Sequence, residues 1–167
     1  GEGHLSRCLS IAKELVKYNC RINFFSKNLL NNSNYLVTQN MFGLEEIQTD
    51  KTKNIEINNL RLLNKNSLKF QKLDLIILDS YQISIAEEKY LKSIIKVVVV
   101  IDDLINRKFV CDLIINYNFG ISKRHYDNLY DYKNTNLLIG RSFIPLKLKN
   151  YQLVPYKKIN KKKISVF

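Results

Sequence analysis

Two short runs of apolar residues, Leu73–Leu78 and Val97–Ile101, constrain the fold more than any other feature of the sequence. Only Asp74 interrupts the first run, and the second reads Val-Val-Val-Val-Ile. Continuous runs of this length are typical of strands buried on both faces, as in a parallel sheet covered by helices. The segment between them, 84–95, has helical periodicity. The pattern therefore predicts two parallel strands joined by a helical crossover.

The rest of the chain continues this alternation of strands and helices. An amphipathic helix is expected over 5–16, because apolar residues recur there at three- and four-residue spacing. Short strands are expected at 21–25, 44–47, 113–115 and 137–139, and helical stretches at 34–42 and 55–70. Alternating strands and helices with few hairpin signals indicate an α/β fold built on a parallel sheet.

The length and composition allow one ordinary domain with a hydrophobic core. Of the 167 residues, 46% are hydrophobic and 25% are charged, which is close to the average of globular proteins. The cysteines Cys8, Cys20 and Cys111 form no Cys-x-x-Cys pair, so neither a disulfide framework nor a zinc site is expected. The longest apolar run is far too short to span a bilayer. We therefore expect a cytoplasmic protein with no membrane partner.

The net charge of +12 is concentrated near the end of the chain. Residues 144–167 contain seven lysines and no acidic residue. This segment, which includes Tyr151 and Tyr156, suits either a patch that binds a nucleic-acid backbone or a solvated linker. The basic residues upstream are dispersed rather than clustered. We therefore favour the linker and expect no nucleic-acid partner.

Polar clusters follow the predicted strands directly. Asp79-Ser80-Tyr81 comes after the first apolar run, Asp102-Asp103 after the second, and Asn116-Tyr117-Asn118 after the next strand. Ligands of parallel α/β sheets bind beyond the carboxyl ends of the strands, so these residues are candidates for a site. Residues 1–4 precede the opening helix, and we expect them to form the turn after a first strand that the chain lacks.

The Gly-x-Gly-His sequence at 1–4 has the features of a substrate-binding turn. A glycine such as Gly3 allows close approach to the amides of a helix N-terminus, where the helix dipole favours negative charge. The same positive potential, with Arg7 one turn along, disfavours an imidazolium, so His4 is expected to be neutral and able to act as a base. Arg7 and the amides would then face a phosphate or a sugar. Alternatively, His4 caps the helix and Arg7 lies at the surface.

The other candidates each have a structural alternative. Asp102 and Asp103 can bind a metal ion, but adjacent side chains on a strand end point opposite ways, and capping of the next turn is favoured. Tyr81 can stack on a sugar or pack a loop. Asn118 can bind a substrate or close a turn. His125 is expected to lie in a loop.

Five stretches together resemble one protein family. They are Gly1–Leu9, Asp79–Tyr81, Ile101–Arg107, Cys111–Asn118 and Gly140–Phe143, in this order along nearly the whole chain. The combination of Gly-x-Gly-His-x-x-Arg-Cys, Ile-Asp-Asp and Cys-Asp is similar to the UDP-sugar hydrolases of pseudaminic acid biosynthesis, whose relatives include proteins of spore-coat polysaccharide synthesis. Where that family has Tyr and Arg in a Gly-x-x-Tyr-x-x-x-Arg segment, this chain has Phe143 and Lys147, which weakens any polar role of the loop.

The resemblance implies a two-domain fold similar to the GT-B glycosyltransferases. Residues 1–150 would be the Rossmann-like N-terminal domain, without its first strand and with the catalytic histidine. Residues 151–167 would be a linker followed by Ile164–Phe167 as the first strand of a truncated, UDP-binding C-terminal domain. These residues alone are therefore not expected to turn over substrate.

The resemblance also implies a reaction, the hydrolysis of UDP-2,4-diacetamido-2,4,6-trideoxy-β-L-altropyranose to the free sugar and UDP. His4 would activate the water that attacks the anomeric carbon, and Gly3, Arg7, Tyr81 and Asn118 would bind the substrate. No metal or other cofactor is expected, and the protein is expected to be a monomer. The alternatives are a glycosyltransferase or epimerase of the same fold and a non-catalytic module that binds a sugar nucleotide or a nucleic acid.

Overall fold

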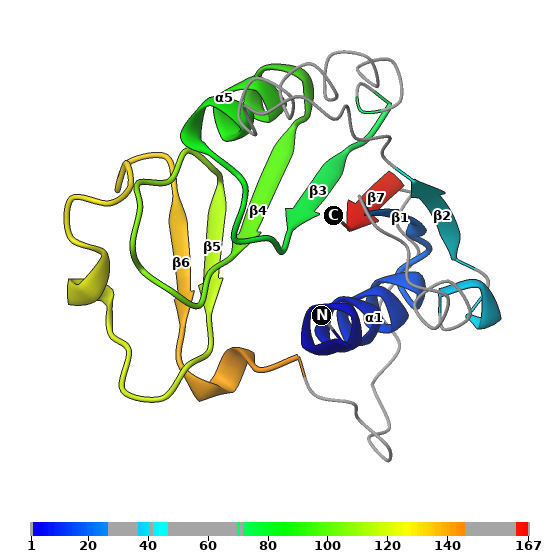
Figure 1. Ribbon diagram of the computed structural model, residues 1–167, viewed down its shortest axis with the longest axis horizontal. Coiled ribbons are helices and arrows are strands. Elements are labelled where there is room, and N and C mark those ends of the chain that lie inside the picture. The colour runs from blue at the N-terminus through cyan, green and yellow to red at the C-terminus, as the bar shows by residue number, and fades with distance from the viewer. Residues whose placement is uncertain are drawn as a thin grey trace.

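The computed structural model describes residues 2–26, 37–40, 42–46, 70, 72–145 and 163–166. Within these residues, one sheet of seven strands has the order β2-β1-β7-β3-β4-β5-β6, and all neighbouring strands run parallel (Figure 1). The strands are β1 (Arg21–Ser26), β2 (Gly43–Glu46), β3 (Leu75–Leu78), β4 (Val97–Ile101), β5 (Leu113–Asn116), β6 (Asn136–Ile139) and β7 (Lys163–Val166). The helices are α1 (Glu2–Val16), α5 (Ile85–Ile94) and the short 3-10 helices η1 (Lys123–Tyr126) and η2 (Arg141–Phe143). The expected α/β fold with a parallel sheet is confirmed, and it is compatible with a Rossmann-like arrangement.

The apolar runs that predicted buried strands form β3 and β4. β4 has the predicted bounds, and β3 begins at Leu75. Alternate residues along each strand enter different cores, as the two-residue period of a strand requires. Ile76 and Val98 belong to one core, and Ile77 and Val99 belong to the other. Because both faces are covered, the two runs show no alternation of apolar and polar residues.

Helices α1 and α5 contribute to opposite cores of the sheet. Leu9 and Ala12 of α1 lie in one core, and Leu91 of α5 lies in the other. A capping box begins α5, since Ser84 accepts from the Glu87 amide and the Glu87 side chain accepts from the Ser84 amide. The helix expected from Ser84 therefore starts at the following residue. Among the described residues, no helix is both long and apolar enough to cross a lipid bilayer.

Strand β7 lies between β1 and β3 and is parallel to both. The sequence predicted a strand at Ile164–Phe167 but assigned it to a second domain, and it left the centre of the first sheet without a strand. In the structure, Ile164 pairs with Ile22 of β1 on one side and with Leu75 of β3 on the other. The strand itself was predicted, whereas its place in this sheet was not. The division into two domains stays a prediction.

The section between β1 and β3 is described in part. Residues 37–39 are helical, within the helix expected before Gly43. Gly43, which follows the expected helix directly, is the first residue of β2 and pairs with Asn23. A Cβ atom at Gly43 would lie 2.2 Å from Asn23 Oδ1 but 3.6 Å from the backbone oxygen of Ile22, so a larger residue at this position would require the Asn23 side chain to move. Apart from Phe70, the helix expected at 55–70 lies outside the described residues.

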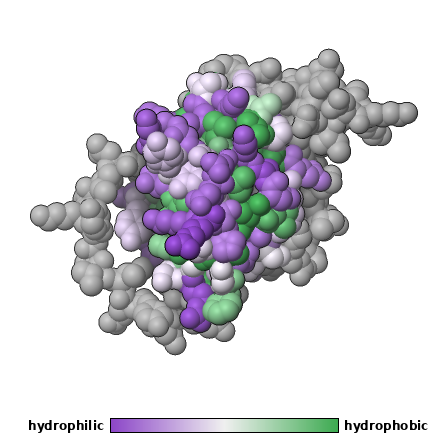
Figure 2. All heavy atoms as spheres, turned by 90° about the vertical axis from the view of Figure 1, so that its left-hand side faces the viewer, coloured by the Kyte–Doolittle hydropathy of each residue, from purple (hydrophilic) through white to green (hydrophobic). Residues whose placement is uncertain are grey.

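The described sheet ends at β6 on one side. Residues 137–139 of this strand are half-buried. Figure 2 faces this side of the molecule and shows mainly hydrophilic side chains, with smaller hydrophobic areas between them. A polar surface around an edge strand disfavours its pairing with strands of other chains.

The three cysteines lie in the described part of the chain, and none forms a disulfide. Cys8 and Cys111 are buried, whereas Cys20 is partly exposed. Burial raises the pKa of the Cys8 thiol, and the nearby Asp79 carboxylate raises it further. Burial also raises the pKa of the Cys111 thiol, with a further contribution from Glu88. Both thiols therefore have little reactive thiolate at neutral or mildly alkaline pH.

Thiol labelling should separate the three cysteines. With an aromatic disulfide reagent at about pH 8, which lies below the raised pKa values of Cys8 and Cys111, we expect one thiol to react in the native protein and all three to react in urea. The Cys20→Ser variant should lose the native reaction. Rapid native labelling of Cys8 or Cys111 would contradict the buried positions of these residues.

Candidate functional site

The site begins in the first turn of α1. The sequence predicted that Gly3 and His4 precede the helix, but the helix starts at Glu2, so both residues lie inside it. The amides of a first helical turn have no partner within the helix, so they still face outward as donors. Gly3 is exposed, and a Cβ atom added there would meet no atom of the described residues within 4 Å. The described part of the chain therefore leaves space beside this residue.

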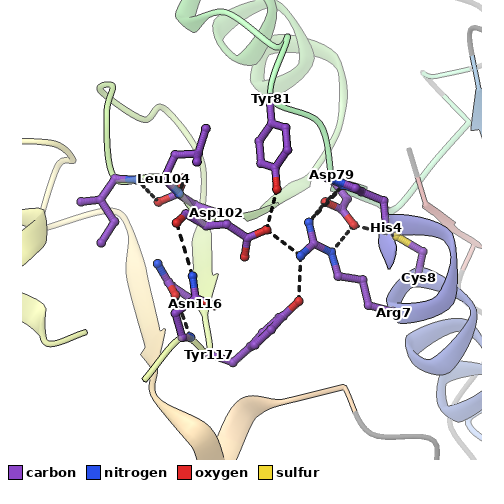
Figure 3. Close-up of polar contacts among 12 residues, drawn as sticks. His4, Arg7, Cys8, Asp79, Tyr81, Asp102, Leu104, Asn116 and Tyr117 are labelled. Carbon is purple, nitrogen blue, oxygen red and sulfur yellow. Dashed lines mark hydrogen bonds and ion pairs between the residues drawn. The ribbon is translucent and has the colours of Figure 1, made fainter. Parts of the chain in front are cut away.

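The His4 ring is held by Asp79, the residue that follows β3. His4 Nδ1 lies 2.7 Å from Asp79 Oδ1, and the exposed fractions of the two side chains are 28% and 1% (Figure 3). Arg7 also pairs with Asp79, and the oxygen of a carboxylate can only accept a hydrogen bond. Donation from His4 to Asp79 therefore requires the proton on Nδ1, an atom that also lies 3.1 Å from Arg7 Nη2. In the neutral ring, Nε2 then has the lone pair.

Arg7 links the carboxyl ends of three strands. Its Nε donates to Asp79 Oδ2 at 2.5 Å, and its Nη2 donates to Asp79 Oδ1. Its Nη1 donates at 2.7 Å both to Asp103 Oδ2, after β4, and to Tyr117 OH, after β5 (Figure 3). Its side chain is only 12% exposed, so the alternative of a surface arginine is wrong. All three of its nitrogens donate to protein acceptors.

The charge of Arg7 is secured by these contacts. Burial by itself lowers the pKa of the guanidinium, but hydrogen bonds to Asp79, Asp103 and Tyr117 outweigh this effect and raise the pKa above its ordinary value. Arg7 is therefore a fixed cation between two carboxylates. Pairs of this kind, forked and largely buried, are among the stronger charge-assisted contacts in proteins.

Asp79 also accepts a hydrogen bond from Cys8. The Cys8 thiol lies 3.3 Å from Asp79 Oδ2, and both side chains are buried. Cys8 lies in the core to which α1 contributes. Asp79 thus collects donors from His4, Arg7 and Cys8, which all lie on the first two turns of one helix.

Tyr81 lies against His4. Its ring meets the His4 ring edge-on, with 4.8 Å between the ring centroids, and its hydroxyl donates to Asp103 Oδ2 at 3.0 Å. The hydrogen bond to Asp103 raises the pKa of the Tyr81 phenol, so the phenol stays protonated. With an exposed fraction of 55%, the ring also presents an apolar surface beside the histidine.

The two adjacent aspartates face different partners, as predicted. Asp103 contacts Arg7 and Tyr81. Asp102 instead accepts from the amides of Leu104 and Ile105, at 3.2 and 3.1 Å, which confirms its predicted capping of the next turn. It also accepts from the buried Tyr126 hydroxyl at 2.6 Å. No group of three or more His, Cys, Asp or Glu side chains in the described part of the chain is arranged to hold a metal ion.

The asparagines after β5 shape the loop beside the cluster. Asn116 is fully buried, donates to Tyr126 OH at 2.9 Å and accepts from the Asn118 amide at 2.9 Å. Asn118 Nδ2 donates to the carbonyl of Asp103 at 3.3 Å. Asn118, predicted to bind substrate, therefore lies next to the cluster, and its side-chain amide group contacts backbone in this structure.

Two further candidates lie apart from the cluster. His125 is exposed in η1, where its Nδ1 accepts from the Ser122 amide at 3.1 Å, in agreement with its predicted loop position. Phe143 is exposed in η2. Lys147 lies outside the described residues.

The structure thus brings His4, Arg7 and Tyr81 together and adds Asp79, Asp103 and Tyr117, whose roles sequence reasoning missed. The sequence analysis named all three as candidates from their place after predicted strands, but it did not predict their contacts with His4 and Arg7. Comparison with protein-family models finds no matching family, and comparison with curated proteins finds no match. The fold and the site therefore define an α/β protein whose histidine–carboxylate–guanidinium cluster lies at the carboxyl ends of β3, β4 and β5.

Proposed function

We propose that this chain is the N-terminal part of a UDP-sugar hydrolase with a GT-B-like, two-domain architecture. The proposed reaction is hydrolysis of UDP-2,4-diacetamido-2,4,6-trideoxy-β-L-altropyranose to the free sugar and UDP. The observation that carries this proposal is the hydrogen bond between His4 Nδ1 and Asp79 Oδ1, which leaves Nε2 as a base. The family resemblance of the five sequence stretches supplies the choice of substrate.

In the proposed mechanism, His4 Nε2 takes a proton from a water molecule. The water oxygen forms a bond to the anomeric carbon while the bond between that carbon and the UDP oxygen breaks, so UDP leaves with the bonding electrons and the configuration inverts. The buried Asp79 carboxylate stabilises the imidazolium that forms, because it lies 2.7 Å from Nδ1. Release of the proton to solvent restores the neutral base.

The remaining residues position the reacting groups. Arg7 fixes Asp79 and Asp103, since its nitrogens donate to both. The exposed Tyr81 ring packs against the sugar beside His4. The amides near Gly3, which has open space around it, face the substrate. The UDP moiety is assigned to the C-terminal domain of the proposed two-domain architecture.

The experiment that tests the function incubates the complete protein with the UDP-sugar in the absence of any acceptor. We expect free sugar and UDP in equal amounts, with an inverted anomeric configuration in the first product seen by NMR. A glycosyltransferase would transfer the sugar only when an acceptor is added, and an epimerase would convert the UDP-sugar without releasing UDP. Either of those results would overturn the proposed hydrolysis.

A further inference from the structure

Asp103 has one oxygen with partners and one without. Its Oδ2 accepts from Arg7 Nη1 at 2.7 Å and from Tyr81 OH at 3.0 Å. Its Oδ1 is buried and has no hydrogen-bond partner among the described residues. A buried acceptor without a donor is costly to a protein. An oxygen of this kind, within a functional cluster, indicates a position where a ligand donates a hydrogen bond.

The charges around this oxygen define what kind of ligand group fits. Asp79 and Asp103 carry two negative charges, and Arg7 carries the one positive charge that pairs with both. The Tyr81 phenol, whose pKa is raised, adds no negative charge. The resulting excess of negative charge disfavours a phosphate at this position. A neutral group with an N–H or O–H donor is favoured instead.

Asp103, which carries the unpartnered oxygen, and His4, the proposed base, contact the same two residues. Tyr81 contacts both Asp103 and the His4 ring. Arg7 also contacts both, with its Nη2 3.1 Å from His4 Nδ1. The Asp103 side chain is 15% exposed, and the terminal torsion of an aspartate rotates over a broad range. A ligand donor that reaches this partly exposed carboxylate can therefore pair with Oδ1 after a rotation about this torsion.

We propose that Asp103 Oδ1 accepts a hydrogen bond from a neutral donor of the sugar, either an acetamido N–H or a hydroxyl group, and thereby selects the substrate. This inference rests on the proposed function and adds the group that recognises the sugar. It also implies two separate binding positions. The N–H or O–H group of the sugar binds at Asp103, and the phosphates of UDP bind elsewhere.

The test uses Asp103→Asn in the complete protein. An asparagine keeps one oxygen for Arg7 and Tyr81 but replaces the unpartnered oxygen by an NH₂ donor, so it inverts the polarity at this one position. The substrates are the UDP-sugar and three analogues in which the 2-acetamido group, the 4-acetamido group or the 3-hydroxyl group is replaced by hydrogen. In the wild type, we expect kcat/KM to fall by about 10–100-fold for one analogue, the usual range for a hydrogen bond to a charged group.

In Asp103→Asn, the difference between the natural substrate and that analogue should shrink to about threefold or less. The matched control is Tyr117→Phe, which removes the other acceptor of Arg7 Nη1 but leaves Asp103 intact; it should retain the full discrimination. Discrimination that persists unchanged in Asp103→Asn, or that is lost equally in Tyr117→Phe, would overturn the proposal. Inorganic phosphate that shifts the carboxyl carbon resonance of Asp103 would overturn it too.

Equilibrium binding separates this inference from the proposed function. Binding of the same four UDP-sugars is measured in a His4→Asn background, in which turnover is expected to be at least about 100-fold slower. If the complete protein fails to hydrolyse the sugar nucleotide but still binds it with Asp103-dependent discrimination, the hydrolase assignment fails and the recognition role stands. If hydrolysis proceeds without that discrimination, the recognition role fails alone.

Discussion

Replacement of His4 by asparagine is expected to lower kcat for UDP release by about 10²–10⁴-fold, the usual contribution of a general base. Asparagine retains an N–H group that can donate to Asp79 in place of Nδ1, so the contact at the end of β3 is preserved. It has no equivalent of Nε2, so the water keeps its proton. The affinity for UDP should change little, because UDP is assigned to the other domain.

The chain offers a matched control for this substitution. His125 is the other histidine of the sequence, and it is exposed in η1, where Ser122 is its partner. His125→Asn should leave kcat and KM within about twofold of the wild type, because surface substitutions away from a site have small effects. A His4→Asn protein that still releases UDP at the wild-type rate would remove His4 from the mechanism.

Replacement of Asp79 by alanine is expected to lower the free energy of unfolding by about 3 kcal/mol. Donors of His4, Arg7 and Cys8 would lose their acceptor in a buried environment, and breaking a buried ion pair typically costs about 3–5 kcal/mol. Asp103 still pairs with Arg7 in the variant, which places the loss at the low end of this range. Urea denaturation followed by circular dichroism measures the change.

The exposed ion pair between Glu14 and Lys17 supplies the comparison for Asp79. Its side chains are 35% and 51% exposed, so Glu14→Ala should cost less than about 1 kcal/mol. Asp79→Asn keeps one acceptor oxygen, so its loss in the free energy of unfolding should lie between those of Asp79→Ala and Glu14→Ala. Equal stability losses in Asp79→Ala and Glu14→Ala would show that the buried network adds nothing to stability.

The fold was predictable where local pattern and burial coincide. Val97–Ile101 forms a strand with the predicted bounds because every residue in it enters one of two cores. The helix begun by Ser84 was predictable because its cap is local in sequence. The place of Lys163–Val166 in the sheet was not predictable. The tendency of a segment to form a strand is local, but the strands with which this one pairs, β1 and β3, lie far away in the sequence.

The position of the site in the fold was predictable, but the hydrogen bonds and ion pairs between its residues were not. The rule that ligands bind beyond the carboxyl ends of parallel strands singled out His4 and Tyr81, and the structure places them in contact. The pairing of Asp79 with His4 and Arg7 depends on how α1 lies over the sheet, which no local pattern records. The same holds for Tyr117, whose hydroxyl reaches Arg7 from β5.

The central position of β7 has a consequence for the order of events when the chain is synthesised. β1 and β3 emerge from the ribosome well before residues 163–166, yet each uses one of its edges to pair with them. Until then both strands present an unpaired edge, which is the kind of surface on which chains aggregate. We therefore expect newly made chains to be prone to aggregation until residues 163–166 are synthesised and inserted between these two strands.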